Sequence, residues 1–221
     1  MPQTMIKVSN LHKAYQSLEV LKGVDLTINN GEILSIVGSS GAGKTTLLQI
    51  LGTLESPSKG TVYFGDIDIF KLKEKELAKF RNTEIGFIFQ FHQLLPEFNA
   101  VENAILPALI KGVSKEEAIQ QAEALFRILH IEHRKDHFPN ELSGGEQQRV
   151  AIARALINNP KYVFADEPSG NLDSQNAKEL HQLFFDLREK FGTAFIIVTH
   201  NQELADMADR KLTMKDGIIA E

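Results

Sequence analysis

The sequence contains no cysteine. Without thiols, the 221-residue chain can form neither disulfides nor thiolate metal sites, which fits a reducing compartment. Long apolar runs are also missing, since a run such as residues 195–198 is far too short to cross a bilayer. Residues 1–7 carry no apolar segment of the kind found in secretion signals. These absences predict a cytoplasmic chain that does not insert into a membrane.

Basic residues are fewer than acidic ones. The chain has 24 Lys and Arg against 29 Asp and Glu, a formal net charge of −5. Such a balance provides no general basic surface for a phosphate backbone, which argues against nucleic acid as the main partner. The hydrophobic share of 43% is typical of a globular protein whose length allows one sizeable core.

Short apolar runs that alternate with helical patterns predict an α/β fold with a mostly parallel sheet. The strands expected in this sheet include residues 33–37, 85–89, 162–165 and 195–199. A looser alternation over residues 6–28 predicts further strands that end at an Asn-Asn-Gly turn. Residues 91–107 are expected to be irregular, although they are rich in hydrophobic side chains.

The most specific local pattern is a glycine-rich loop between a predicted strand and a predicted helix. Its residues, with the one that follows, are Gly38, Ser39, Ser40, Gly41, Ala42, Gly43, Lys44, Thr45 and Thr46. Glycines let backbone N–H groups converge on phosphate oxygens, and the helix adds the positive end of its dipole. We expect Lys44 to reach the β- and γ-phosphates and Thr45 to bind Mg²⁺. A chance glycine-rich turn is the alternative, but the strand–loop–helix context favours a nucleotide.

Two adjacent acids follow the apolar run at residues 162–165. Asp166 could hold Mg²⁺, usually through water, and Glu167 could orient or deprotonate the attacking water. The alternative is that the pair only caps the next turn. Because ligands of parallel α/β sheets bind at the carboxyl ends of the strands, the catalytic interpretation is favoured after a phosphate loop.

A second glycine-rich helix start lies about a hundred residues beyond the first. It consists of Ser143, Gly144, Gly145 and Glu146, with Ser143 suited to cap the helix. An ordinary capped helix is one interpretation. The other is an anion site that serves a second copy of the chain, since one loop already cradles the phosphates in its own chain.

Three single residues are candidates because of their positions. Gln90 and His200 each follow a predicted core strand. Gln90 could contact Mg²⁺ and the water, His200 could contact the γ-phosphate, and Tyr15 could stack on adenine. Taken singly, each of these residue types is more often structural. The histidines at 130, 133 and 137 have no well-placed acid, so no metal site is expected there.

Together these elements resemble the nucleotide-binding subunit of ABC transporters over essentially the whole chain. In that family's terms the matches are Tyr15 (A-loop), residues 38–45 (Walker A), Gln90 (Q-loop), residues 142–147 (signature), Asp166 and Glu167 (Walker B and catalytic glutamate), residues 171–173 (D-loop) and His200 (H-loop). The resemblance implies an ATPase that uses ATP and Mg²⁺, with catalytic roles for Glu167, His200, Gln90 and Lys44. It also implies Mg²⁺ contacts from Thr45, Gln90 and Asp166.

The resemblance further implies one ABC ATPase domain, residues 1–221, with two lobes. A RecA-like P-loop NTPase core with a small antiparallel β subdomain would comprise residues 1–91 and 160–221. An inserted helical subdomain, residues 92–159, would carry the signature. Two copies would pack head to tail around two ATP molecules, each held by one chain's loop and the other's residues 143–146.

Within the family, the phrase at residues 90–98 and the following Val-Glu-Asn are similar to the group that releases lipoproteins from the bacterial inner membrane. This implies a peripheral protein on the cytoplasmic face, bound to integral membrane subunits of an ABC transporter (LolC/LolE-like). We expect the partner to contact Phe91, His92, Leu94, Leu95, Pro96 and Phe98, although these residues could instead be core.

Other roles stay open from the sequence. An FtsE-like ATPase would signal to a division-linked membrane protein, and a MacB-like ATPase would drive efflux. MacB-type chains are normally fused to a membrane domain, which this sequence does not contain. Soluble ABC-type ATPases of DNA or ribosomes usually have two nucleotide domains or a long coiled-coil insert, neither of which is present.

Overall fold

A computed structural model describes residues 4–220 of the chain. The strands are β1 (Thr4–Tyr15), β2 (Leu18–Asn29), β3 (Ile33–Gly38), β4 (Lys59–Phe64), β5 (Ile67–Asp68), β6 (Ile85–Phe89), β7 (Tyr162–Asp166), β8 (Ala194–Val198), β9 (Arg210–Lys215) and β10 (Ile218–Ala220). The helices are α1 (Lys44–Leu51), α2 (Glu74–Glu84), α3 (Ala100–Lys111), α4 (Lys115–Ile128), α5 (Gly144–Leu156), α6 (Ser174–Phe191) and α7 (Gln202–Met207). Short 3₁₀ turns lie at Ile69–Lys71, Glu132–Arg134 and Pro139–Glu141.

The strands form two sheets. The larger sheet has the order β10-β9-β3-β8-β7-β6, in which β9 to β6 are parallel and only β10 is antiparallel to its neighbour. The smaller sheet, β2-β1-β4-β5, is antiparallel. This arrangement confirms the predicted α/β class, with a mostly parallel sheet and a separate antiparallel one.

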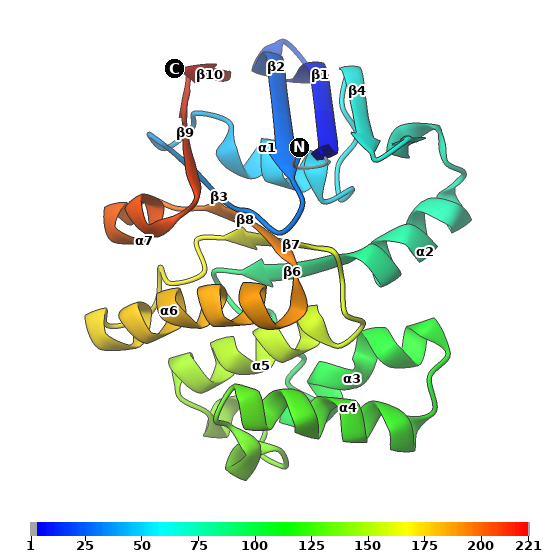
Figure 1. Cartoon of the computed structure of the whole chain (residues 1–221), viewed down its shortest axis with the longest axis vertical. Helices are drawn as coiled ribbons and strands as arrows, with labels where there is room; N and C mark the ends of the chain where they lie inside the picture. Colours follow the sequence, from blue (N-terminus) through cyan, green and yellow to red (C-terminus); the bar gives the residue numbers. More distant parts are fainter. Residues whose placement is uncertain (1–3, 221) are drawn as a thin grey trace.

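The large sheet separates two hydrophobic cores. Successive strand residues face opposite sides, so Val163 packs with α3 to α6, whereas Phe164 packs with α1 and the antiparallel sheet. Figure 1 shows the layers: the small sheet and α1 lie above the large sheet, and α5 and α6 lie below it. The central strands β3, β7 and β8 are therefore buried on both faces, as their continuous apolar sequences require, whereas β9 is largely exposed.

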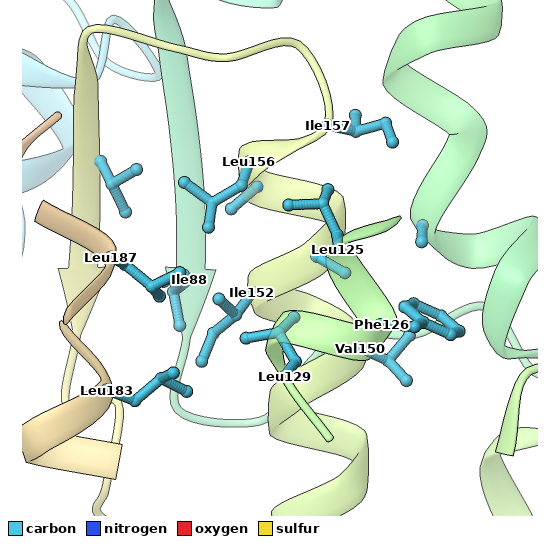
Figure 2. Close-up of a cluster of buried hydrophobic side chains, with 14 of the residues drawn as sticks. Ile88, Leu125, Phe126, Leu129, Val150, Ile152, Leu156, Ile157, Leu183 and Leu187 are labelled. Atoms are coloured by element: carbon cyan, nitrogen blue, oxygen red, sulfur yellow. The ribbon is translucent and has the colours of Figure 1, made fainter. Parts of the chain in front are cut away.

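Helices α3, α4 and α5 form a compact group between β6 and β7 in the sequence. Helix α5 lies between the sheet and α4, with Ile152 toward Ile88 of β6 and Val150 toward Phe126 of α4 (Figure 2). All four side chains are fully buried. Among residues 4–220, no helix combines the length and the apolarity that a bilayer span needs.

The expectation that residues 91–107 are irregular is wrong for their second half, where α3 begins. Asn99 caps this helix: its side chain accepts from the Glu102 N–H (2.9 Å), and the Glu102 carboxylate accepts from the Asn99 N–H (3.1 Å). The helix continues through Pro107 because its apolar face is buried against α4 and α5. Tertiary packing thus outweighs the cost of an internal proline.

Candidate active site

The loop between β3 and α1 closes around the side chain of Lys44. The Lys44 ammonium donates to the carbonyl oxygens of Gly38 (2.8 Å) and Ser39 (3.0 Å). Gly43 has a φ of 99°, and a Cβ atom there would lie 3.1 Å from the Val20 carbonyl oxygen. Glycine is therefore required at this position, both for its conformation and for the close approach of β2.

A cleft of about 570 Å³ lies in front of this loop. Its lining includes most of the residues predicted to touch nucleotide, Mg²⁺ or water: Gly38, Ser40, Gly41, Gly43, Lys44, Thr45, Thr46, Gln90, Glu167 and His200. They come from the ends of β3, β6, β7 and β8 and from the start of α1. The carboxyl edge of the parallel sheet thus brings together side chains more than 150 residues apart in sequence.

Asp166 and Thr45 place two oxygen atoms of the kind that bind cations side by side. The Thr45 hydroxyl donates to Asp166 Oδ1 at 3.3 Å. Burial raises the pKa of Asp166, with the charge of Glu167 acting in the same direction, while the Thr45 hydrogen bond and the charge of Lys44 partly offset it. A cation beside this carboxylate would favour its ionised form. Such a small oxygen set suits Mg²⁺, which is usually held by one or two protein ligands plus phosphates and water.

Glu167 and His200 meet across neighbouring strands. Because β7 and β8 are parallel and Asp166 pairs with Val198, the residues that follow the two strands leave the sheet at the same level. Glu167 Oε2 accepts from the backbone N–H of His200 (3.2 Å) and lies 2.8 Å from the ring Nδ1. The Glu167 side chain is largely shielded, whereas the His200 ring is 71% exposed. A carboxylate held at the cleft in this way can orient a water and accept its proton.

Gln90 extends β6 next to the same edge, since Phe89 pairs with Asp166. Asn171 is bound to Gln90 twice: its amide donates to the Gln90 carbonyl (2.8 Å), and its Oδ1 accepts from the Gln90 side chain (3.4 Å). Sequence analysis did not single out Asn171 as a site residue. The family resemblance includes residues 171–173, but the contact of Asn171 with Gln90 is visible only in three dimensions.

Three predicted nucleotide contacts do not line the cleft. Ala42 is buried, Ser39 contributes its carbonyl to Lys44, and Tyr15 is half exposed with the Lys13 ammonium 4.8 Å from its ring centre. Leu18 and Val20 of β2 line the cleft instead. Their role could not be predicted, because an exposed leucine near a strand end has no distinctive sequence signal.

The second glycine-rich helix start lies outside this cleft. Ser143 caps α5, and its backbone N–H and hydroxyl both contact Glu146 Oε2 at 2.8 Å. Gly144 and Gly145 occupy the first turn of α5. None of residues 143–146 lines the cleft of its own chain, and Ser143 and Gly144 are exposed.

Arg134 supports this helix start and was missed by sequence analysis. Its guanidinium donates to Glu146 Oε1 at 2.6 Å, while the other carboxylate oxygen holds Ser143. Burial opposes ionisation, but the bonds from Ser143 and Arg134 outweigh it and lower the pKa of Glu146. The Ser143 hydroxyl is therefore fixed through an ionised carboxylate and an arginine from the 3₁₀ turn Glu132–Arg134.

The residues predicted to contact a membrane partner differ in exposure. Phe91, Leu95 and Pro96 are exposed, whereas Leu94 packs against the core around α5. Burial lowers the pKa of the half-buried His92, although a Gln147 hydrogen bond partly offsets the effect. None of the six lines the nearby groove of about 450 Å³ between α2, α3 and α5, although Gln93 does.

The chain belongs to the ABC transporter family, whose model matches residues 21–170. It is an ATPase of that family. The chain is similar to the lipoprotein-releasing system ATP-binding protein LolD of Cytophaga hutchinsonii, with 57% identity over 98% of this chain and 99% of the relative. The LolD protein of Bacteroides thetaiotaomicron is 58% identical over 97% of this chain and 99% of its own length.

Solved structures agree with this assignment. An ATP-binding cassette solved as a dimer in a post-hydrolysis state with ADP and Pi is 40% identical, with a TM-score of 0.91 over 98% of this chain and 97% of its own. A second structure, described as a dimeric bacterial ABC transporter cassette, is 41% identical with the same TM-score and coverage. The likeness thus extends over both sheets and the group of helices α3 to α5.

Proposed function

We propose that the cleft binds the triphosphate of ATP and that Glu167 drives its hydrolysis. The observation that carries this proposal is the placement of Lys44, Glu167 and His200 around one cleft at the carboxyl edge of the sheet. In our proposal, the N–H groups of residues 38–46 and the Lys44 ammonium hold the phosphates. Tyr15, near the end of β1, would contact the base.

Glu167 would act on the water that attacks the γ-phosphate. Its carboxylate would orient this water and accept its proton, because a carboxylate within hydrogen-bond reach can serve as a general base. His200 is bound to Glu167, so its ring would steady the carboxylate and contact the γ-phosphate. Gln90 would position the same water from β6.

Thr45, Asp166 and Gln90 are the residues that would hold Mg²⁺. Once bound, Mg²⁺ would neutralise charge on the phosphates. The protein's own contribution is the pair of adjacent oxygens of Thr45 and Asp166, which are already within hydrogen-bond distance.

We further propose that two copies pack head to tail. The helix start at residues 143–146 of one copy would then cover the phosphates in the other copy's cleft. Its N–H groups and the Ser143 hydroxyl would complete a site that one chain leaves open. Support comes from the position of residues 143–146 outside their own cleft and from the two dimeric cassettes that resemble this chain.

At the level of the cell, we propose that the dimer drives the release of lipoproteins from the bacterial inner membrane. The LolD proteins that the chain resembles are named for such a system. The chain would lie on the cytoplasmic face, bound to integral membrane subunits (LolC/LolE-like). Phe91, Leu95 and the groove near Gln93 are the surfaces where we place this contact.

Affinity capture from detergent-solubilised membranes, with the bound proteins identified by mass spectrometry, tests this role. Two related multi-pass proteins with large extracytoplasmic domains are expected. A single partner tied to the division machinery would favour signalling instead. The Lys44→Ala chain is a useful control, since it should capture the same partners while losing ATP binding.

A further inference from the structure

A buried histidine lies beneath the loop that follows Glu167. His181 of α6 is 1% exposed, and its ring Nε2 lies 3.1 Å from the hydroxyl of Ser169, which is itself 7% exposed. Neither side chain lines the nucleotide cleft. The proposed steps of binding and hydrolysis use neither residue, so this buried polar pair needs its own explanation.

The hydrogen on the ring can be assigned from what surrounds it. His181 Nδ1 has no hydrogen-bond partner among residues 4–220, and burial lowers the pKa of the ring. A neutral ring with its hydrogen on Nε2 leaves only a lone pair unpaired at Nδ1. The other tautomer would leave a buried N–H group unpaired, which proteins rarely tolerate. His181 thus donates to Ser169.

Ser169 belongs to a tight turn that begins at Glu167. The Gly170 N–H donates to the Glu167 carbonyl (3.0 Å), and the Leu172 N–H donates to the Ser169 carbonyl (3.1 Å). Glu167 itself has a φ of 47°, in the left-handed region that non-glycine residues seldom adopt. Such a conformation persists only where the surrounding structure fixes it.

The turn is held from several sides. The Glu167 N–H donates to the Val198 carbonyl of β8 (2.9 Å), and Asn171 is tied to Gln90 of β6. The contact from His181 adds a hydrogen bond from α6 to Ser169 in the middle of the turn. Without the His181 ring, the buried Ser169 hydroxyl in the middle of the turn would lose this hydrogen-bond donor.

We infer that His181 is a positioning residue for ATP hydrolysis. By fixing Ser169, it holds the turn that aims the Glu167 carboxylate at the attacking water. The inference rests on the proposed catalytic role of Glu167. It concerns the orientation of the carboxylate only, so it predicts an effect on the hydrolytic step and not on nucleotide affinity.

The test compares steady-state ATP hydrolysis by the purified full-length chain and its variants. His181→Phe keeps a ring but removes the donor, and Ser169→Ala removes the acceptor. Each is expected to lower kcat about three- to ten-fold, as one hydrogen bond would, with KM for ATP within about two-fold of wild type. The double variant should lose no more than either single variant.

Conservative variants separate positioning from general damage. His181→Gln places an amide N–H near the position of Nε2, and Ser169→Thr keeps the hydroxyl, so both should retain most of the activity. Gln182→Ala changes the exposed neighbour on α6 and should leave kcat unchanged. If His181→Phe does not fold, Ser169→Ala, which removes a single oxygen, carries the test.

The Glu167→Gln chain distinguishes the two proposals. In that background, His181→Phe should cause no further loss, because there is no carboxylate left to aim. A normal rate for Glu167→Gln alone would overturn the catalytic assignment on which the inference rests. Slow hydrolysis by Glu167→Gln together with normal kcat in both His181→Phe and Ser169→Ala would overturn the inference alone.

Discussion

Two adjacent carboxylates at the end of β7 have different surroundings. Asp166 is directed toward Thr45 of the phosphate loop, whereas Glu167 turns toward His200 of β8. The change of direction follows from the positive φ of Glu167, which redirects the chain immediately after the strand. One sequence dipeptide can therefore supply both a cation ligand and a base for water.

Replacement of Glu167 by Gln should separate binding from hydrolysis. The amide cannot accept the proton from water, so we expect kcat to fall by at least about 100-fold while ATP still binds. Dimers should then accumulate in the presence of Mg²⁺ and ATP, which size-exclusion chromatography can detect. A mutant that hydrolyses ATP at the wild-type rate would remove Glu167 from its proposed role.

The ionised side chain of Asp166 should lower the free energy of unfolding of the nucleotide-free chain. Its pKa is raised by burial, so the folded state binds the proton more tightly than the unfolded state does. The ionised carboxylate therefore destabilises the fold as pH rises above the ordinary aspartate value of 3.8. We expect Asp166→Asn to be more stable than wild type in urea unfolding at pH 7, with a smaller difference near pH 4.

The same variant should bind Mg²⁺ and ATP more weakly, because it lacks the anionic ligand. Asp206→Asn provides a control, since this exposed carboxylate is paired with Lys211 and does not line the cleft. Equal stability of Asp166→Asn and wild type at both pH values would contradict the expected cost of burial.

At the scale of elements, α5 and α3 link the surfaces that carry the proposed functions. Helix α5 is capped by Ser143, and further along its Arg154 donates to the carbonyls of His92 and Gln93, each at 2.7 Å. Both of these residues have positive φ. The turn that follows Gln90 is therefore attached to the helix that begins at the second glycine-rich segment.

Asn103 of α3 fixes the rest of the 91–98 segment. Fully buried, it accepts from the Leu95 N–H (2.8 Å) and donates toward the carbonyls of Leu95 (3.0 Å) and Phe98 (2.9 Å). The Asn103 amide thus makes the hydrogen bonds to the loop backbone that a neighbouring strand would otherwise make. Together with Arg154, which binds the first residues of the segment, Asn103 satisfies its irregular backbone from a helix that sequence analysis did not predict.

Asn103→Ala should lower the free energy of unfolding by about 2–4 kcal/mol, since several buried backbone groups would lose their partner. Asn99→Ala, which removes only the helix cap, should cost about 1 kcal/mol. Urea unfolding of the two variants measures the difference. Equal losses would mean that Asn103 does not hold the loop in the way we describe.

For the molecule as a whole, the core below the large sheet connects the strands that end at the cleft to the loop at residues 91–98, where we propose the partner contact. The core below the sheet includes strand residues such as Val163 and helix residues from α3 to α6. Leu94 packs against this core while Leu95 remains exposed. Leu94 thus contributes to the packing of the core, whereas the adjacent Leu95 is accessible at the surface.

This difference gives a matched pair of variants. Leu95→Asp should leave the ATPase activity of the isolated chain within about two-fold of wild type, yet weaken its capture of membrane partners. Leu94→Asp should destabilise the chain and reduce both properties, because it brings a charge to the core. If Leu95→Asp also abolishes isolated activity, Leu95 is core and the contact proposal fails.

Much of the fold and of the cleft was predictable from short-range patterns. The loop at residues 38–45, the strand that ends at Asp166 and the cap at Ser143 are local, so their chemistry depends on neighbours in the chain. Parallel strands also align their carboxyl ends, which is why Gln90, Glu167 and His200 could be expected together. The same residues carry the resemblance to the ABC family, which the comparisons confirm.

The remaining features follow from long-range packing, because they depend on contacts between distant segments. Helix α3 forms where packing outweighs an internal proline, and Arg134 reaches Glu146 only after the 3₁₀ turn folds against α5. The bond between His181 and Ser169 joins α6 to the turn after Glu167 in the same way. The sequence determined the class of chemistry, and long-range packing determined how its groups are held.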